Sequence, residues 1–83
     1  MSAAQASPAS RKYLWDFFGP NAERTAAHFE KHLLEFLEEH EYVGATTGLE
    51  SAGEGHHAAY CLAGSELGAE LQAALRPNRA VAV

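Results

Sequence analysis

The sequence predicts an α+β fold in which two helices cover one side of an antiparallel sheet. A short, aromatic-rich segment at residues 12–18 has the composition of a β-strand. Between residues 22 and 40, apolar residues recur with the period of an amphipathic helix. Two segments of alternating character, residues 42–50 and 56–63, flank a glycine-containing stretch and are typical of a hairpin.

The first strand, KYLWDFF at residues 12–18, is followed by a Gly-Pro pair. Side chains alternate across a strand, so one side would carry Tyr13, Trp15 and Phe17 and the other Leu14, Asp16 and Phe18. Both sides hold apolar bulk. We therefore expect a central strand that is at least partly covered on each side.

The first helix is expected to begin near Pro20, because a proline at the first helical position loses no hydrogen bond. On a helical wheel, one stripe about 100° wide gathers Ala22, Ala26, Phe29, Leu33, Phe36 and Leu37. We expect this stripe to pack against the sheet. The remaining surface of the helix would then face water.

The hairpin is expected to consist of a strand at residues 42–50, a loop of about five residues at 51–55 and a return strand at 56–63. In the return strand, His57, Ala59 and Cys61 would share one side.

A second helix would follow Ser65, a residue that can cap a helix N-terminus. Its apolar positions have helical spacing, and Pro77 would end it. The final segment, RAVAV at residues 79–83, has the composition of a short fourth strand.

The expected order is β-α-β-β-α, with a further β if residues 79–83 pair. Short connections and a tight central hairpin favour a split β-α-β layout, which resembles the ferredoxin-like (α/β-plait) superfold. The resemblance rests on element order over residues 12–83. It implies a two-layer sandwich with both helices on one face of an antiparallel sheet, and it implies no particular function because this superfold hosts many. We expect a flexible leader at residues 1–10 and one α+β domain at residues 11–83.

Charge and composition exclude several classes of function. The chain has 83 residues, six basic against eleven acidic, and a formal net charge of −5. Such a balance disfavours nucleic acid and anionic membranes as partners, because both require clustered basic residues. Cys61 is the only cysteine, so an intrachain disulfide is excluded. The small, polar start of the chain does not resemble a secretory signal, and we expect a cytoplasmic protein.

The first candidate site is a metal site on the first helix. His28, His32 and Glu35 lie one turn apart along one ridge, so their side chains could reach one ion. Imidazole and carboxylate suit zinc, nickel or copper. The competing interpretation, which we favour, is an ordinary solvated helix surface, because functional metal sites usually have three or four ligands held by surrounding groups.

The second candidate site combines His57, Cys61 and Asp16. If the two central strands are neighbours and the helices cover the Tyr13 side, these three residues would emerge together on the uncovered side of the sheet. Such a set could hold a metal or activate a thiolate. The competing interpretation treats Cys61 as a small buried hydrophobic residue.

The uncovered side of the sheet is the third candidate, as a partner surface. We expect it to expose Leu14, Phe18 and Ala59, and an exposed apolar face usually marks an interaction site. The preferred hypothesis is therefore a small non-enzymatic binding or assembly module that forms a homodimer through this face. The alternative is a small metal-binding or thiol-dependent protein that uses His28 and His32, or His57 and Cys61. The sequence predicts no catalytic residue, and the one cofactor that these candidate sites would suit is a divalent transition metal.

Overall fold

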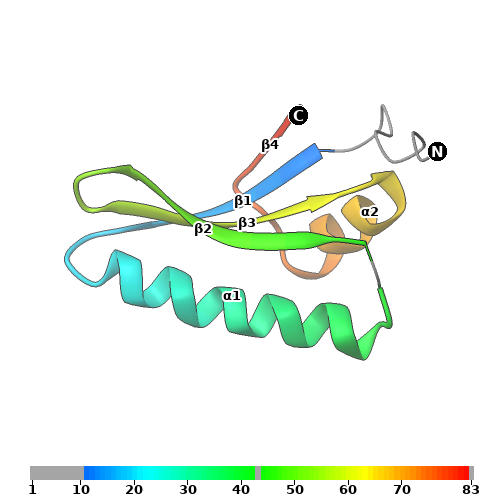
Figure 1. The fold of residues 1–83 in the computed structure, drawn as a ribbon. Helices are drawn as coiled ribbons and strands as arrows, with labels where there is room; N and C mark the ends of the chain where they lie inside the picture. The colour runs from blue at the N-terminus through cyan, green and yellow to red at the C-terminus, as the bar shows by residue number, and fades with distance from the viewer. Residues whose placement is uncertain (1–10, 43, 83) are drawn as a thin grey trace.

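The computed structural model describes residues 11–42 and 44–82, and it confirms the α+β class. Four strands form one antiparallel sheet, and two helices accompany it (Figure 1). In chain order the elements are β1 (Arg11–Phe18), α1 (Ala22–Glu39), β2 (Thr46–Gly53), β3 (His56–Ala63), α2 (Ser65–Ala74) and β4 (Arg79–Ala82). The strand order across the sheet is β2-β3-β1-β4, so β1 and β3 are central. The expectation for residues 1–10 lies outside the described residues.

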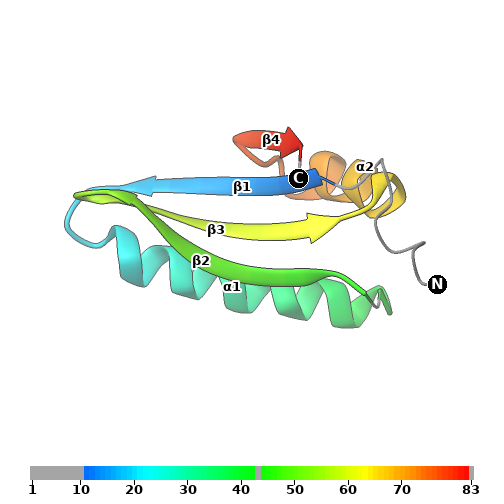
Figure 2. The same ribbon diagram turned by 45° about the horizontal axis from the view of Figure 1, so that its top comes forward.

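Side chains from one face of the central strands contact both helices. Tyr13, Trp15 and Cys61 form one buried cluster with Leu33 of α1 and Leu71 of α2. Figure 2 shows α1 running beneath the sheet along β2 and β3. Trp15 connects the layers most directly, because its ring packs 5.0 Å from the ring of Phe29 and its Nε1–H donates to the carbonyl of Leu75 at 2.9 Å. We call the opposite side of the sheet the open face.

The register between β1 and β3 corrects part of the expected face assignment. Tyr13 pairs with Cys61, and Trp15 pairs with Ala59. Directly opposed residues of an antiparallel pair point to the same side of the sheet. Ala59 and Cys61 therefore lie under the helices, where both are fully buried. The expectation that they share the uncovered side with Leu14 and Phe18 is wrong.

The end of α1 explains why β2 begins at Thr46 and not at Tyr42. The amide of Glu41 donates to the carbonyl of Glu38, and the amide of Tyr42 donates to the carbonyl of Leu37. Together with the positive φ of 59° at Glu41, these bonds form a Schellman motif, which includes Tyr42, the residue expected to start the strand.

The hairpin between β2 and β3 is also tighter than expected. Gly53 pairs with His56, so the loop consists of Glu54 and Gly55 alone. Gly55 has a φ of 69°, a conformation that glycine adopts without steric cost. An irregularity between Ser51 and Gly53 marks a β-bulge next to this turn.

The expected fourth strand is present at Arg79–Ala82, where it pairs antiparallel with the first half of β1. Asn78, just before it, donates its amide to the carbonyl of Leu14 at 2.8 Å. In the described part of the chain, neither helix has the length and apolar character required to cross a bilayer.

Candidate functional site on the open sheet face

The open face carries the side chains at even-numbered positions of β1 and β3, together with their neighbours on the edge strands. Within the described residues both helices pack on the other side of the sheet. The open face holds Lys12, Leu14, Asp16, Phe18, Glu50, His56, Ala58, Tyr60, Leu62, Arg79 and Val81. It is therefore a mixed surface of charged, aromatic and aliphatic groups.

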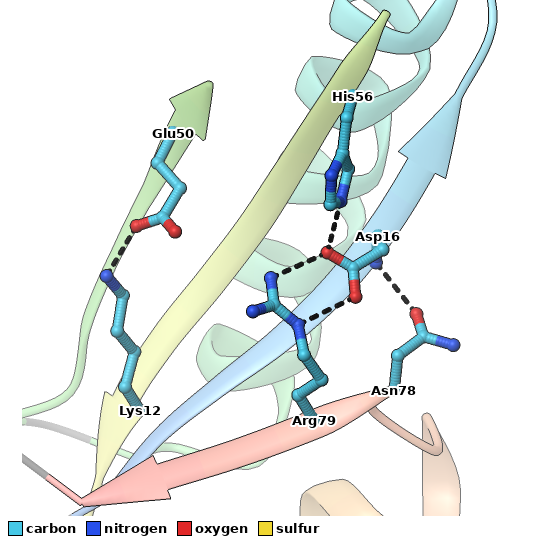
Figure 3. Close-up of polar contacts among 6 residues, drawn as sticks. All are labelled: Lys12, Asp16, Glu50, His56, Asn78 and Arg79. Atoms are coloured by element: carbon cyan, nitrogen blue, oxygen red, sulfur yellow. Dashed lines mark hydrogen bonds and ion pairs between the residues drawn. The ribbon is translucent and has the colours of Figure 1, made fainter. Parts of the chain in front are cut away.

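Asp16 is the centre of a polar cluster on this face (Figure 3). Arg79 donates from Nε to Oδ2 at 2.9 Å and from an Nη atom to Oδ1 at 2.7 Å, which is the bidentate geometry of a strong ion pair. His56 donates from Nε2 to Oδ1 at 2.8 Å. The backbone amide of Asp16 donates to Oδ1 of Asn78 at 2.7 Å. We call these four residues the Asp16 cluster.

The surroundings of Asp16 hold its carboxylate in the ionised form. Its side chain is only 9% exposed, and burial alone would raise the pKa. The hydrogen bond from Arg79, which is the largest effect, lowers the pKa of Asp16 below its ordinary value, with a smaller contribution from His56. The ion pair in turn raises the pKa of Arg79. Asp16 is therefore an anion at neutral pH with both oxygens already accepting hydrogen bonds.

Asp16→Asn is expected to lower the free energy of unfolding at pH 7 by about 1–2 kcal/mol, because Arg79 and His56 lose a charged acceptor but can be partly rehydrated. The folded-state pKa of Asp16 lies below its unfolded value of about 3.8. Its contribution is thus complete above that pH and is lost as the pH falls through the lower folded pKa. Chemical denaturation of both proteins at neutral and acidic pH measures the difference.

Glu50→Gln is the matched control, because it removes a carboxylate from the same face. Glu50 pairs with Lys12, and both side chains are partly exposed, so we expect a loss below about 1 kcal/mol. If Asp16→Asn costs no more than Glu50→Gln at neutral pH, the Asp16 cluster does not stabilise the fold.

The middle of the open face is less apolar than expected from the sequence. Leu14 lies between its cross-strand neighbours Tyr60 and Arg79 and is only 2% exposed. The Tyr60 ring covers Gly48, where a Cβ atom would lie 2.6 Å from its Cζ atom. The Lys12 ammonium group sits 4.6 Å from the centroid of the same ring. Leu14 is thus part of the interior and cannot contact a partner.

Phe18, at the end of β1, is the most exposed large apolar side chain among the described residues of the open face. It is 72% exposed, and its ring stacks on His56 with centroids 4.3 Å apart. Because His56 also contacts Asp16, the exposed aromatic ring is joined to the Asp16 cluster. Val81, on the edge strand β4, is a second exposed apolar side chain on this face.

The structure separates the second candidate set. Cys61 and His57 pair with Tyr13 and Phe17 and lie on the helix-covered side, whereas Asp16 points to the open face. Burial raises the pKa of the Cys61 thiol to about 11, so the sulfur is protonated at neutral pH. The histidine that contacts Asp16 is His56, one position away from the predicted His57.

The first candidate set stays together on the exposed surface of α1. His28 and His32 place their Nε2 atoms 3.0 Å apart, and Glu35 lies 3.3 Å from Nδ1 of His32. Across residues 11–42 and 44–82, no group of three or more histidine, cysteine or acidic side chains converges as metal ligands would.

Sequence reasoning missed His56, Asn78 and Arg79 as partners of Asp16. They lie 40 to 63 positions away along the chain. The contact depends on the hairpin register and on the pairing of β4 with β1. The sequence contained one weak indication of this contact. Asp16 is an acidic residue on a predicted central strand, and Arg79 begins the segment that could form a fourth strand.

Comparisons with known proteins add no family to this description: no family model, curated protein or solved structure matches the chain.

Proposed function

We propose that this protein is a small non-enzymatic binding and assembly module of ferredoxin-like (α/β-plait) architecture, which pairs with a second copy of itself through the open face. The observation that carries the proposal is Phe18, a large aromatic side chain that is 72% exposed on the side of the sheet away from both helices. Exposed aromatic groups are enriched among the residues that dominate binding energy.

The strand order supports the architectural part of the proposal. A β-α-β-β-α-β chain whose sheet reads β2-β3-β1-β4 has its first and third strands at the centre, as the split β-α-β layout requires. The two helices pack on one side of the sheet, and within residues 11–42 and 44–82 no other element covers the opposite side.

The charge distribution favours self-association through the open face over self-association through the exposed surface of α1. The whole chain has a net charge of −5, and α1 alone carries five glutamates against two basic residues. The open face carries two acids and two bases, Asp16 and Glu50 with Arg79 and Lys12, and they are paired with each other. Two acidic copies can therefore meet through this surface without bringing unpaired acidic groups of the open face together.

The open face is small for a protein–protein interface. Three strands of eight residues and one of four, about 4.8 Å apart and with about 3.3 Å per residue, span about 450 Å². Two copies would bury about 900 Å², which is in the range of weak, transient interfaces. We expect a dissociation constant on the order of micromolar.

The protonation states of Asp16 and Cys61 support a non-enzymatic role. A general base needs a free acceptor near a reacting proton. Both oxygens of Asp16 already accept hydrogen bonds from Arg79 or His56, and its lowered pKa makes it a weak base. The Cys61 sulfur is buried and protonated, so it is a poor nucleophile.

Phe18→Glu is the substitution that tests the interface. Static light scattering after size-exclusion chromatography, over loading concentrations from micromolar to millimolar, should show a monomer–dimer equilibrium for the natural chain. The substitution should raise the dissociation constant about tenfold or more, because it places a charge where an apolar ring is buried in the dimer.

Leu34→Glu is the matched control, because Leu34 is also an exposed apolar residue but lies on α1. It should leave the dissociation constant unchanged. A monomer at every concentration would overturn the proposal, and so would a dimer that Leu34→Glu breaks and Phe18→Glu does not.

A further inference from the structure

Two histidine rings on the exposed side of α1 point their Nε2 atoms at each other. His28 and His32 are one helical turn apart, and their Nε2 atoms are separated by 3.0 Å. The rings meet nearly at right angles, with an interplanar angle of 82° and centroids 4.5 Å apart. One proton fits between the two nitrogens, so the two Nε2 positions face a common point.

Glu35 lies beside the other ring nitrogen of His32. Its Oε1 atom is 3.3 Å from Nδ1 of His32, and a carboxylate can only accept a hydrogen bond. This proximity favours the neutral tautomer of His32 that carries its proton on Nδ1 and keeps the lone pair on Nε2. A carboxylate close to the second nitrogen of a histidine is the usual outer contact of a metal-ligating imidazole.

We propose that His28 and His32 chelate a divalent transition metal through their Nε2 atoms, with Glu35 orienting His32 from outside the coordination sphere. The ion takes the place of the proton between the rings. His28 moves its proton from Nε2 to Nδ1, so the neutral pair binds the ion without net loss of a proton. Solvent fills the other positions, in agreement with the lack of a third converging ligand in the described part of the chain.

The distance between the two nitrogens selects among metals. With metal–nitrogen bonds of about 2.0–2.1 Å, two nitrogens 3.0 Å apart subtend about 90–97° at the ion. That is the angle between adjacent ligands in square-planar or octahedral coordination, and it is narrower than the tetrahedral angle that zinc prefers. The geometry therefore favours Cu²⁺, then Ni²⁺, over Zn²⁺, and Cu²⁺ also has the highest intrinsic affinity of the three for nitrogen ligands.

Copper(II) chloride added to the ¹⁵N-labelled chain is the direct probe, because Cu²⁺ broadens amide signals near its site. One equivalent should broaden signals from the middle of α1. His28→Gln and His32→Gln should each weaken binding about tenfold or more. His40→Gln is the matched control, since His40 follows the end of the same helix and packs its ring against Phe36, and it should leave binding unchanged.

A second pair of variants tests the role of Glu35. Glu35→Ala should weaken copper binding severalfold, whereas Glu39→Ala, which removes the same charge one turn further along α1, should have a smaller effect. Equal effects would mean that the carboxylate acts only through its charge, and would overturn the orienting role.

The whole proposal is overturned if broadening centres on another part of the chain, if the histidine variants bind as the natural chain does, or if Zn²⁺ binds more tightly than Cu²⁺. The two surfaces are separate, since α1 packs on the side of the sheet away from the open face. The light-scattering experiment can therefore exclude the dimer without affecting the metal site, and the copper titration can exclude the metal site without affecting the dimer.

Discussion

Leu33→Ala is expected to lower the free energy of unfolding by about 3–4 kcal/mol, because it leaves a cavity at the centre of the core. The Leu33 side chain is 0% exposed and packs in the cluster that joins α1 to β1, β3 and α2. A domain of this size has a total stability of roughly 4–12 kcal/mol, so this loss is a large fraction of it. Urea denaturation followed through the fluorescence of Trp15, the single tryptophan, measures the change.

The neighbouring residue provides the control. Leu34 is 50% exposed, and Leu34→Ala should change the stability by no more than about 0.5 kcal/mol. Similar losses at both positions would mean that Leu34 is buried as deeply as Leu33, and that α1 is rotated about its axis by about 50°, half of one residue's turn.

The orientation of α1 could be predicted from the sequence because a long helix repeats the same information several times. Four of the six residues in the predicted apolar stripe are buried, and the other two, Phe29 and Phe36, are partly buried against the same core. The opposite surface, which includes His28 and His32, is exposed as expected. Each turn of an 18-residue helix supports the same assignment.

The register of β3 against β1 could not be predicted in the same way. The alternation of side chains within each strand follows from the sequence, but a shift of one residue between strands moves a whole set of side chains to the other face. HHAAYCLA contains small or apolar residues at both sets of positions, so both registers bury similar groups. The observed pairing of Trp15 with Ala59 places a small residue opposite a large one beneath α1.

The Asp16 cluster was beyond prediction for a related reason. Asp16 is held by groups from β3 and from β4, and each contact depends on a register that the sequence leaves open. The sequence predicted a sheet face without helices and an exposed Phe18, and both are present in the part of the chain that the structure describes. It did not predict that paired charges would share that face and that Leu14 would be buried among them.

Gly68→Ala is expected to lower the free energy of unfolding by about 2 kcal/mol, although alanine is the better helix former. In an exposed helix this substitution would stabilise by about 1 kcal/mol. Gly68, however, is buried in α2 beneath the Tyr13 ring, and a Cβ atom there would lie 2.6 Å from Cζ of that ring, with Oη closer still. Tyr13 is itself buried, so its rigid ring can move only by displacing core residues, and such overpacking costs about 1–3 kcal/mol.

Two further variants separate the clash from the intrinsic preference of the helix. Ala69→Gly, at the exposed neighbouring position, reports the preference alone and should cost about 1 kcal/mol. Adding Tyr13→Phe to Gly68→Ala removes the closest atom but not Cζ, so it should recover part of the loss, with a coupling above about 0.5 kcal/mol. If Gly68→Ala instead stabilises the chain by as much as Ala69→Gly destabilises it, the Tyr13 ring is not fixed against α2. The close approach of α2 to the sheet would then not require a glycine at position 68, and intrinsic helix preference alone would determine the effect of a substitution there.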